Sequence, residues 1–179
     1  MYLPNPDWVT LEELLNNNII SDEFYHWLTE NGFTSAPASA GHHGNITGGL
    51  YAHSQAVTHR LLSLDAVAGH PWKNPRSPYI VGMFHDLCKI DQYEYKPTDE
   101  FNDGHWRYSN RVILKGHGDK SVMLLSQFMT LTEEEVLCIR YHMGAYEQDD
   151  WESFDKAIRK YPNVLYTHTA DMLASKLDV

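Results

Sequence analysis

A histidine and an aspartate stand side by side at the end of a run of mostly apolar residues. The run extends from Val81 to Ile90 and places its apolar residues at helical spacing, which predicts a buried helix whose last turn carries His85 and Asp86. A buried carboxylate is costly without a counter-charge. Imidazole and carboxylate groups together are a common ligand set for divalent transition metals, which supply that charge. The pair indicates a metal site, with a capped helix end and a hydrogen-bonded histidine as the alternative.

Four further polar residues lie on or at the edges of other predicted helices. They are His53, His117, His142 and Asp171. His53 lies among the inward-facing residues of a helix that opens at Leu50, and His142 falls in the final turn of a helix that begins at the capping box of residues 131–135. Each residue alone fits a hydrogen-bonded core position. Together with His85 and Asp86, they predict convergence on a metal site in the core of a helical bundle.

Two more features place polar groups near this predicted site. The loop Thr34–Gly49 is rich in small residues and contains His42 and His43. A surface loop has no structural need for paired histidines, so they are either solvated or presented to a site that the loop covers. Lys89 follows Asp86 by three residues, close enough to meet an anionic group of a substrate.

The remaining segments predict the elements that position these residues. Helices are expected at residues 7–17, from Ser21 to Asn31, at 151–160 and at 163–177, the last of them packing Leu165, Met172 and Leu173. Residues 92–113 alternate aromatic and polar side chains, which predicts an aromatic β-hairpin, either packed on the helices or acting as a substrate lid. We therefore expect an all-α fold with a small hairpin insertion. Residues 1–34 would form a helical lead-in packed on a core of residues 35–179, within a single structural domain.

Composition limits the class of partner. The chain has 179 residues, 42% of them hydrophobic, and 14 basic against 24 acidic residues give a formal charge of −10. This charge disfavours long nucleic acid as a partner. No apolar run is long enough to span a bilayer, and the N-terminal residues lack the basic and apolar regions of a signal peptide. We expect a cytoplasmic protein with no membrane partner and with Cys88 and Cys138 as buried thiols.

The order of the polar residues resembles a known family. His53, His85-Asp86 and Asp171 are similar to the H…HD…D pattern of the HD-domain superfamily of metal-dependent phosphohydrolases, and His117 and His142 occupy the places that mark its binuclear members. Residues 36–53 resemble the corresponding stretch of bacterial HD-domain 3′→5′ exoribonucleases and relaxase-associated HD domains. Residues 116–121 and 141–144 are similar to stand-alone HD hydrolases. The resemblance covers roughly residues 35–178 and implies an HD-domain helical bundle.

The resemblance also implies a ligand set and a chemistry. One divalent metal would bind His53, His85, Asp86 and Asp171, and a second would bind His117 and His142 with Asp86 as the bridge. The ions would be Mn, Fe, Ni, Co or Zn, with Mg also possible. A divalent ion acidifies a water for attack on phosphorus and stabilises charge on phosphate oxygens. Lys89 would hold a phosphate oxygen, and His42 and His43 would protonate the leaving group or contact the phosphate.

The expected function is hydrolysis of a phosphoester in a nucleotide or another small phosphorylated substrate. Lys89 and His43 would bind the phosphate, and aromatic residues such as Tyr93 and Trp106 would stack on a base. A 3′→5′ exonuclease is one alternative, disfavoured because the chain is acidic and has no obvious OB-type module. A di-iron oxygenase and a nucleotide-binding module without turnover are two others. The sequence does not predict the oligomeric state.

Overall fold

Eight α-helices and one β-hairpin make up most of the regular structure of the described residues, which in this computed structural model are 8–41, 44–69, 72–98, 104–114, 116–144 and 150–178. The helices are α1 (Leu11–Asn16), α2 (Asp22–Glu30), α3 (Gly49–Ala68), α4 (Ser77–Phe84), α5 (His117–Leu125), α6 (Glu133–Arg140), α7 (Trp151–Lys160) and α8 (Asn163–Leu173). The hairpin consists of β1 (Tyr93–Lys96) and β2 (His105–Tyr108). The predicted all-α architecture with a small hairpin is confirmed.

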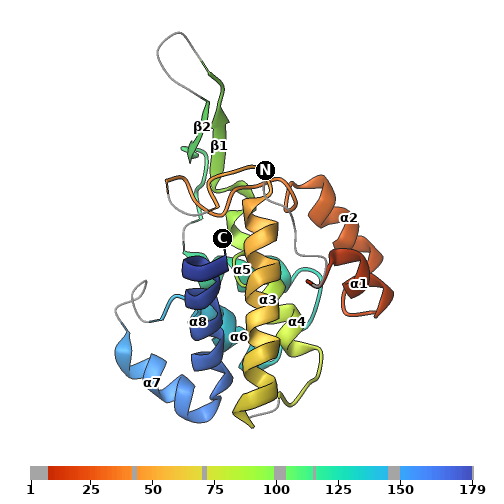
Figure 1. The fold of residues 1–179 in the computed structure, drawn as a ribbon, viewed down its shortest axis with the longest axis vertical. Helices are drawn as coiled ribbons and strands as arrows, with labels where there is room; N and C mark the ends of the chain where they lie inside the picture. Colours follow the sequence, from red (N-terminus) through yellow and green to blue (C-terminus); the bar gives the residue numbers. More distant parts are fainter. Residues whose placement is uncertain are drawn as a thin grey trace.

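Helix α3 is the centre of the bundle. It packs against α4 on one side and α8 on the other, while α6 contacts both of these helices and α5 packs on α6 (Figure 1). From residue 49 to residue 58, every position of α3 except Tyr51 is buried. Polar residues of α3 in this segment, His53 among them, are consequently buried together with the apolar ones.

Two glycines let neighbouring helices approach closely. A Cβ atom on Gly82 of α4 would lie 2.6 Å from the Cα of Thr58 in α3. A Cβ atom on Gly118 of α5 would lie 2.4 Å from the carbonyl oxygen of Arg140 in α6. Real Cβ atoms do not occur at such distances, so the backbones pack directly on each other at both positions. The contact at Gly82 holds the end of α4 beside the middle of α3.

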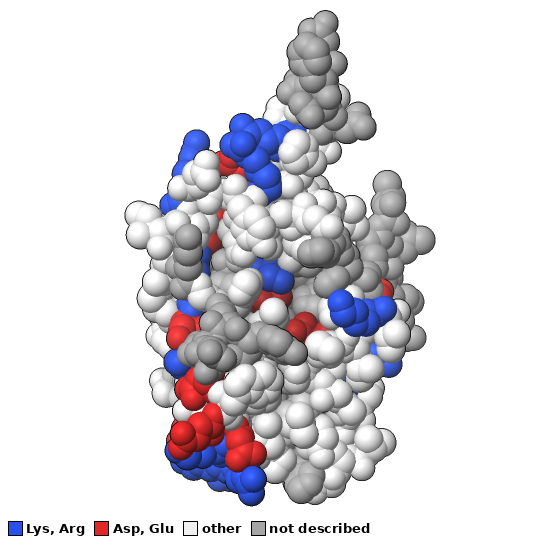
Figure 2. Space-filling view, turned by 90° about the vertical axis from the view of Figure 1, so that its left-hand side faces the viewer, with Lys and Arg blue, Asp and Glu red and all other residues white. Residues whose placement is uncertain are grey.

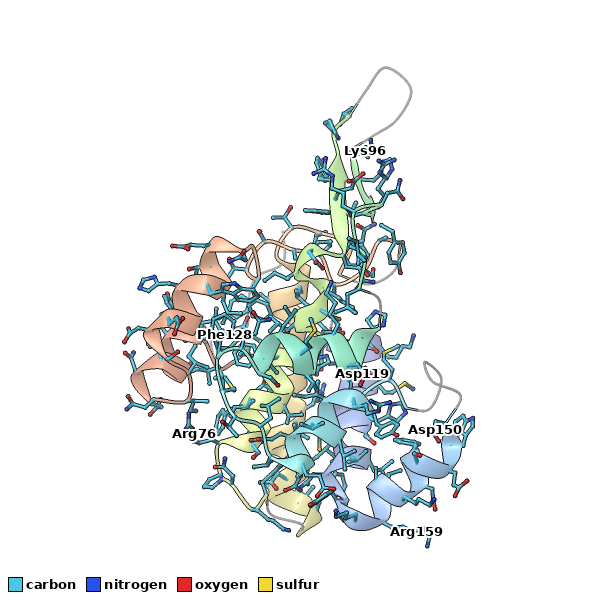
Figure 3. All side chains as sticks on the ribbon, turned by 180° about the vertical axis from the view of Figure 1, so that it is seen from behind. Arg76, Lys96, Asp119, Phe128, Asp150 and Arg159 are labelled. Carbon is cyan, nitrogen blue, oxygen red and sulfur yellow. The ribbon has the colours of Figure 1, made fainter. Side chains whose placement is uncertain are left out.

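The N-terminal helices share the core of the bundle. Thr10 and Glu13 form the predicted capping box at the start of α1. The ring of Phe24 in α2 lies 5.0 Å from the ring of Phe84 in α4 and 4.7 Å from that of Phe128, and Phe128 lies where the N-terminal helices meet the bundle (Figure 3). The backbone N–H of Leu11 also donates to the hydroxyl of Tyr51 in α3, at 3.0 Å.

The hairpin separates aromatic and charged side chains onto opposite faces. Tyr93 pairs with Tyr108 and Tyr95 with Trp106, and directly opposed residues of an antiparallel pair share a face. The ion pair of Glu94 and Arg107 lies on the other face. The hairpin projects from the end of the bundle (Figure 1), with Lys96 high on it (Figure 3). Its Tyr93–Tyr108 end is therefore the one next to the helices.

Several helical predictions differ from the structure. Helix α4 ends at Phe84, so His85 and Asp86 follow this helix and do not lie in its last turn. Helix α1 begins at Leu11, later than the start predicted at residue 7. Helix α6 ends at Arg140, so His142 lies in the turn that follows it and not in its last turn. In α8, Leu165 and Met172 are 43% and 49% exposed, whereas the buried face carries Val164 and otherwise small or polar residues. These small or polar residues are Asn163, Thr167, Ala170, Asp171 and Ala174, the last in the π-helical turn Ala174–Asp178. Small side chains allow α8 to lie close to α3, which the apolar pattern does not reveal.

Candidate metal centre

Four of the predicted ligands meet at one point of the core. His53 Nε2 lies 3.3 Å from His85 Nε2, 3.7 Å from Asp86 Oδ2 and 3.1 Å from Asp171 Oδ1. His85 Nε2 lies 3.6 Å from Asp86 Oδ2 and 3.9 Å from Asp171 Oδ1. Atoms bound about 2.1 Å from a common ion stand about 3.0 Å apart in octahedral and about 3.4 Å apart in tetrahedral geometry. The observed separations are close to these values, and His53, His85 and Asp86 form a buried group that can hold a metal ion.

The helix ends orient two of the imidazoles. His85 caps α4, and its Nδ1 donates to the carbonyl oxygen of Gly82 at 2.9 Å. His142 Nδ1 donates in the same way to Ile139, at 2.7 Å. Because a carbonyl can only accept, both Nδ1 atoms carry the proton, and a neutral ring then directs the lone pair of its Nε2 inward. This backbone contact fixes the tautomer that a metal ligand requires.

The ring of His85 is uncharged, although it lies beside two carboxylates. Burial lowers the pKa of His85 to about 4, despite the neighbouring carboxylates, so the ring is neutral near pH 7. Its Nε2 nevertheless faces the oxygens of Asp86 and Asp171. Acceptors that face one another in a buried site repel. A cation placed between them would remove that repulsion, so the residues present fit a bound metal.

The two oxygens of Asp86 face different partners. Oδ2 is directed to His53, His85 and Lys89, whereas Oδ1 lies 3.4 Å from His142 Nε2. Both Asp86 Oδ1 and His142 Nε2 are buried and lack a hydrogen bond of acceptable geometry. Burial lowers the pKa of His142, but the facing carboxylate of Asp86 offsets this and raises it overall. A carboxylate with one oxygen on each side is arranged as a bridge between two positions.

Lys89 supplies positive charge at the edge of this cluster. Its Nζ lies 2.7 Å from Asp86 Oδ2. Burial would raise the pKa of Asp86, but the charge of Lys89 and the neighbouring imidazole groups of His85 and His142 hold this pKa well below its usual value. Burial lowers the pKa of Lys89, and the ion pair with Asp86 raises it overall. Asp171 also has a lowered pKa, because its contact with His53 outweighs the effect of burial. Both carboxylates are therefore ionised and available as ligands.

The cluster opens into a cavity of about 330 Å³, called here the metal cavity. Its wall includes His53, Asp86, Lys89, Tyr93, Tyr108, His117, His168 and Asp171. Ala38 and Ser39 contribute from the loop that precedes α3. Charged side chains of both signs lie in the central part of the face that α8 and the hairpin share (Figure 2). A small molecule can thus reach the buried carboxylates from this face.

The structure brings most of the predicted site residues together. His53, His85, Asp86, Lys89, His142 and Asp171 lie in contact with one another as described above. His117, the first residue of α5, and Tyr93 line the same cavity. Trp106 lies beside Tyr95, with ring centroids 5.3 Å apart, and is not among the described residues that line the cavity. His42 and His43 lie outside the described residues.

Several residues of the metal cavity, His168 and Tyr108 among them, escaped the sequence-based prediction of the site. His168 lines the cavity, and its Nδ1 donates to the carbonyl oxygen of His142 at 2.7 Å. It precedes Asp171 by three residues, a spacing that places both on one helix face and that was a usable signal. Tyr108 was expected only as part of the aromatic hairpin, yet it lines the cavity beside Tyr93. Tyr108 lies beside Tyr93 because the two residues are paired in the register of the two strands, and this register cannot be read from the sequence.

Comparisons with known proteins add no relative. The chain matches no protein-family model and no curated protein, and its fold matches no solved structure. Within the described part of the chain, no helix combines the length and the apolar character that crossing a membrane requires.

Proposed function

We propose that the protein is a metal-dependent phosphohydrolase of the HD-domain type, acting on a nucleotide or another small phosphoester. One observation carries the proposal: the imidazole nitrogens of His53 and His85 converge with oxygens of Asp86 and Asp171 beside a cavity that also presents Lys89. This combination suits the binding of metal ions and a phosphate at one place.

The ligand roles follow from the measured contacts. We assign His53, His85, Asp86 and Asp171 to one ion, and Asp86 and His142 to a second, with His117 completing it from the cavity wall. Divalent ions held there supply charge to stabilise phosphate oxygens and lower the pKa of a water that attacks phosphorus. Mn, Fe, Co, Ni and Zn suit this set of nitrogen and oxygen ligands.

Other residues of the metal cavity would bind and orient the substrate. Lys89 lies between Asp86 and the cavity, so its ammonium group can donate to a non-bridging phosphate oxygen. His168 donates from Nδ1 to a carbonyl oxygen, so its Nε2 is the atom available to a hydroxyl group or a water. His42 and His43 keep the leaving-group role proposed for them from the sequence.

The size of the site favours a small substrate. The metal cavity encloses about 330 Å³, and the formal charge of the chain is −10. A protein that tracks a long polyanion needs several basic contacts along its path. Arg107, a basic residue of the hairpin, is already paired with Glu94. These features favour a mononucleotide or short phosphodiester over a long strand.

Replacing Asp86 tests the proposal, with Asp155→Asn as the control. Asp155 is an exposed carboxylate of α7 that pairs with Arg159. Mn²⁺ binding and hydrolysis of bis(p-nitrophenyl) phosphate, nucleotides and a long oligonucleotide would be measured for both variants. We expect Asp86→Asn to lose bound metal and to lower turnover by more than about 100-fold, because the only carboxylate shared by both positions is removed. Asp155→Asn should behave as the wild type.

Three results would contradict the proposal. They are wild-type protein that binds no more metal than Asp86→Asn, absence of phosphoester turnover with each of the five metals, and turnover that persists in Asp86→Asn. Processive degradation of the long oligonucleotide, with mononucleotides left intact, would favour the exonuclease alternative.

A further inference from the structure

A second cavity of about 470 Å³ adjoins the metal cavity. We call it the hairpin chamber, and its wall includes Gln92, Tyr108, Ser109, Asn110, Val112 and His117. Tyr108 and His117 also line the metal cavity, so these two residues form the common border of both spaces. A ligand that lies at the buried carboxylates is therefore adjacent to the hairpin chamber across these two residues.

The wall of the hairpin chamber is suited to an uncharged, planar group. Val112 and Leu114 are apolar, and Tyr108 offers a ring on which another ring can stack. Lys120 is the one Lys, Arg, Asp or Glu side chain among the described wall residues, and its Nζ pairs with Asp91 Oδ1 at 2.5 Å. The charge of Lys120 is thereby largely neutralised. A second phosphate would find little to bind it in this chamber.

Polar side chains of the chamber wall can form hydrogen bonds with the edge of an uncharged, planar group. The carboxamides of Gln92 and Asn110 each offer a donor and an acceptor, and Ser109 adds a hydroxyl. The backbone N–H of Ser109 donates to the carbonyl oxygen of Gln92 at 2.9 Å, which holds the two chain segments together at the base of the hairpin. Nucleobases present edges of donors and acceptors around a stacking face.

We propose that the hairpin chamber is a nucleobase-binding subsite. The substrate places its phosphoester at the metal cluster and its sugar at the border formed by Tyr108 and His117, and its base enters the chamber and stacks on Tyr108. This inference rests on the proposed function for the phosphate end. The base would contact Tyr108 and its neighbours in the chamber wall. It would not contact Trp106, because Trp106 lies outside the described walls of both cavities.

The test compares two ligands that differ only in the base. Adenosine 5′-monophosphate and ribose 5-phosphate share the sugar and the phosphate, and their binding to the Mn²⁺-loaded full chain is measured by calorimetry. We expect the nucleotide to bind about tenfold more tightly, since the contribution of a stacked base is of that order. Equal affinities for the two ligands would overturn the proposal.

Matched variants locate the effect in the hairpin chamber. Val112→Trp fills the chamber and should abolish the preference for the nucleotide. Ile113→Trp adds the same side chain at the next position, which is 96% exposed and outside the described walls of both cavities, and should keep it. Asn110→Leu changes an exposed residue at similar volume and should reduce the preference severalfold. A preference retained in both folded chamber variants would refute the subsite.

The binding and turnover measurements separate this inference from the proposed function. Preferential binding of the nucleotide without hydrolysis of any phosphoester would support the chamber and refute the phosphohydrolase. Hydrolysis of phosphoesters with equal affinities for the two ligands would support the phosphohydrolase and refute the chamber.

Discussion

The metal cluster and the hairpin chamber adjoin each other but are built differently. The imidazoles of His85 and His142 are buried and oriented by carbonyl groups at helix ends. Tyr108 in the chamber wall is 62% exposed and belongs to a strand that projects from the bundle. Metal ligands must be held to within a fraction of an ångström, whereas stacking tolerates some displacement. Helix packing therefore positions the proposed metal ligands, and a more exposed element would provide the proposed recognition of the base.

The largest effect should come from Gly82→Ala, which disturbs the metal cluster without changing a ligand. The new Cβ atom would lie 2.6 Å from the Cα of Thr58 and would force α3 and α4 apart. His53 and His85, one on each helix, would separate. We expect a loss of about 1–3 kcal/mol in the free energy of unfolding, from overpacking, together with loss of metal binding. Thermal unfolding and Mn²⁺ titration measure the two effects.

Gly41→Ala is the matched control for this change. A Cβ atom on Gly41 meets no other atom within 4 Å, so this variant should keep both stability and metal. Unchanged Mn²⁺ affinity in Gly82→Ala would show that the cluster does not depend on the close contact of α3 and α4.

Lys89→Ala should have the next largest effect, on turnover alone. Lys89 contacts Asp86 but is not part of the group that can hold the metal. Its removal should leave Mn²⁺ bound and lower kcat/KM for small phosphoesters by about 100-fold, as for a lost donor to a developing charge. Metal analysis and steady-state kinetics would be run beside Lys156→Ala, which alters a surface pair of α7. Loss of metal from Lys89→Ala would contradict this assignment, because it would show that Lys89 is needed for metal binding.

The cluster was the more predictable of the two regions. Burying a polar side chain among apolar residues of a helix is costly unless that side chain has a partner. His53, His85 and Asp171 are buried in this way, and their positions among apolar residues are visible in the sequence. Capping signals at Thr10 and Thr132 likewise marked where α1 and α6 begin. These signals are local, so a single sequence contains them.

The sequence did not reveal features that depend on close packing between distant segments. The buried face of α8 carries Thr167 and Ala170 in place of larger apolar residues, because α8 lies against α3. The hairpin chamber exists because the base of the hairpin lies beside the start of α5, which brings Tyr108 next to His117. Neither of these two contacts between distant segments produces a periodic pattern or a characteristic residue spacing in the sequence.

The smallest expected effect separates two aromatic residues of the same hairpin face. Tyr108 borders both cavities, whereas Trp106 makes an edge-to-face contact with Tyr95 farther along the hairpin. Tyr108→Ala should raise the KM for a nucleotide substrate about tenfold, because the base loses its stacking partner. Trp106→Ala should raise it by no more than about twofold, since this ring supports the hairpin and does not reach the described walls of either cavity. Steady-state kinetics on one nucleotide substrate compares the two variants directly. A larger effect at Trp106 than at Tyr108 would contradict the chamber as the base-binding subsite. It would instead indicate that the base stacks on Trp106, as the sequence alone suggests.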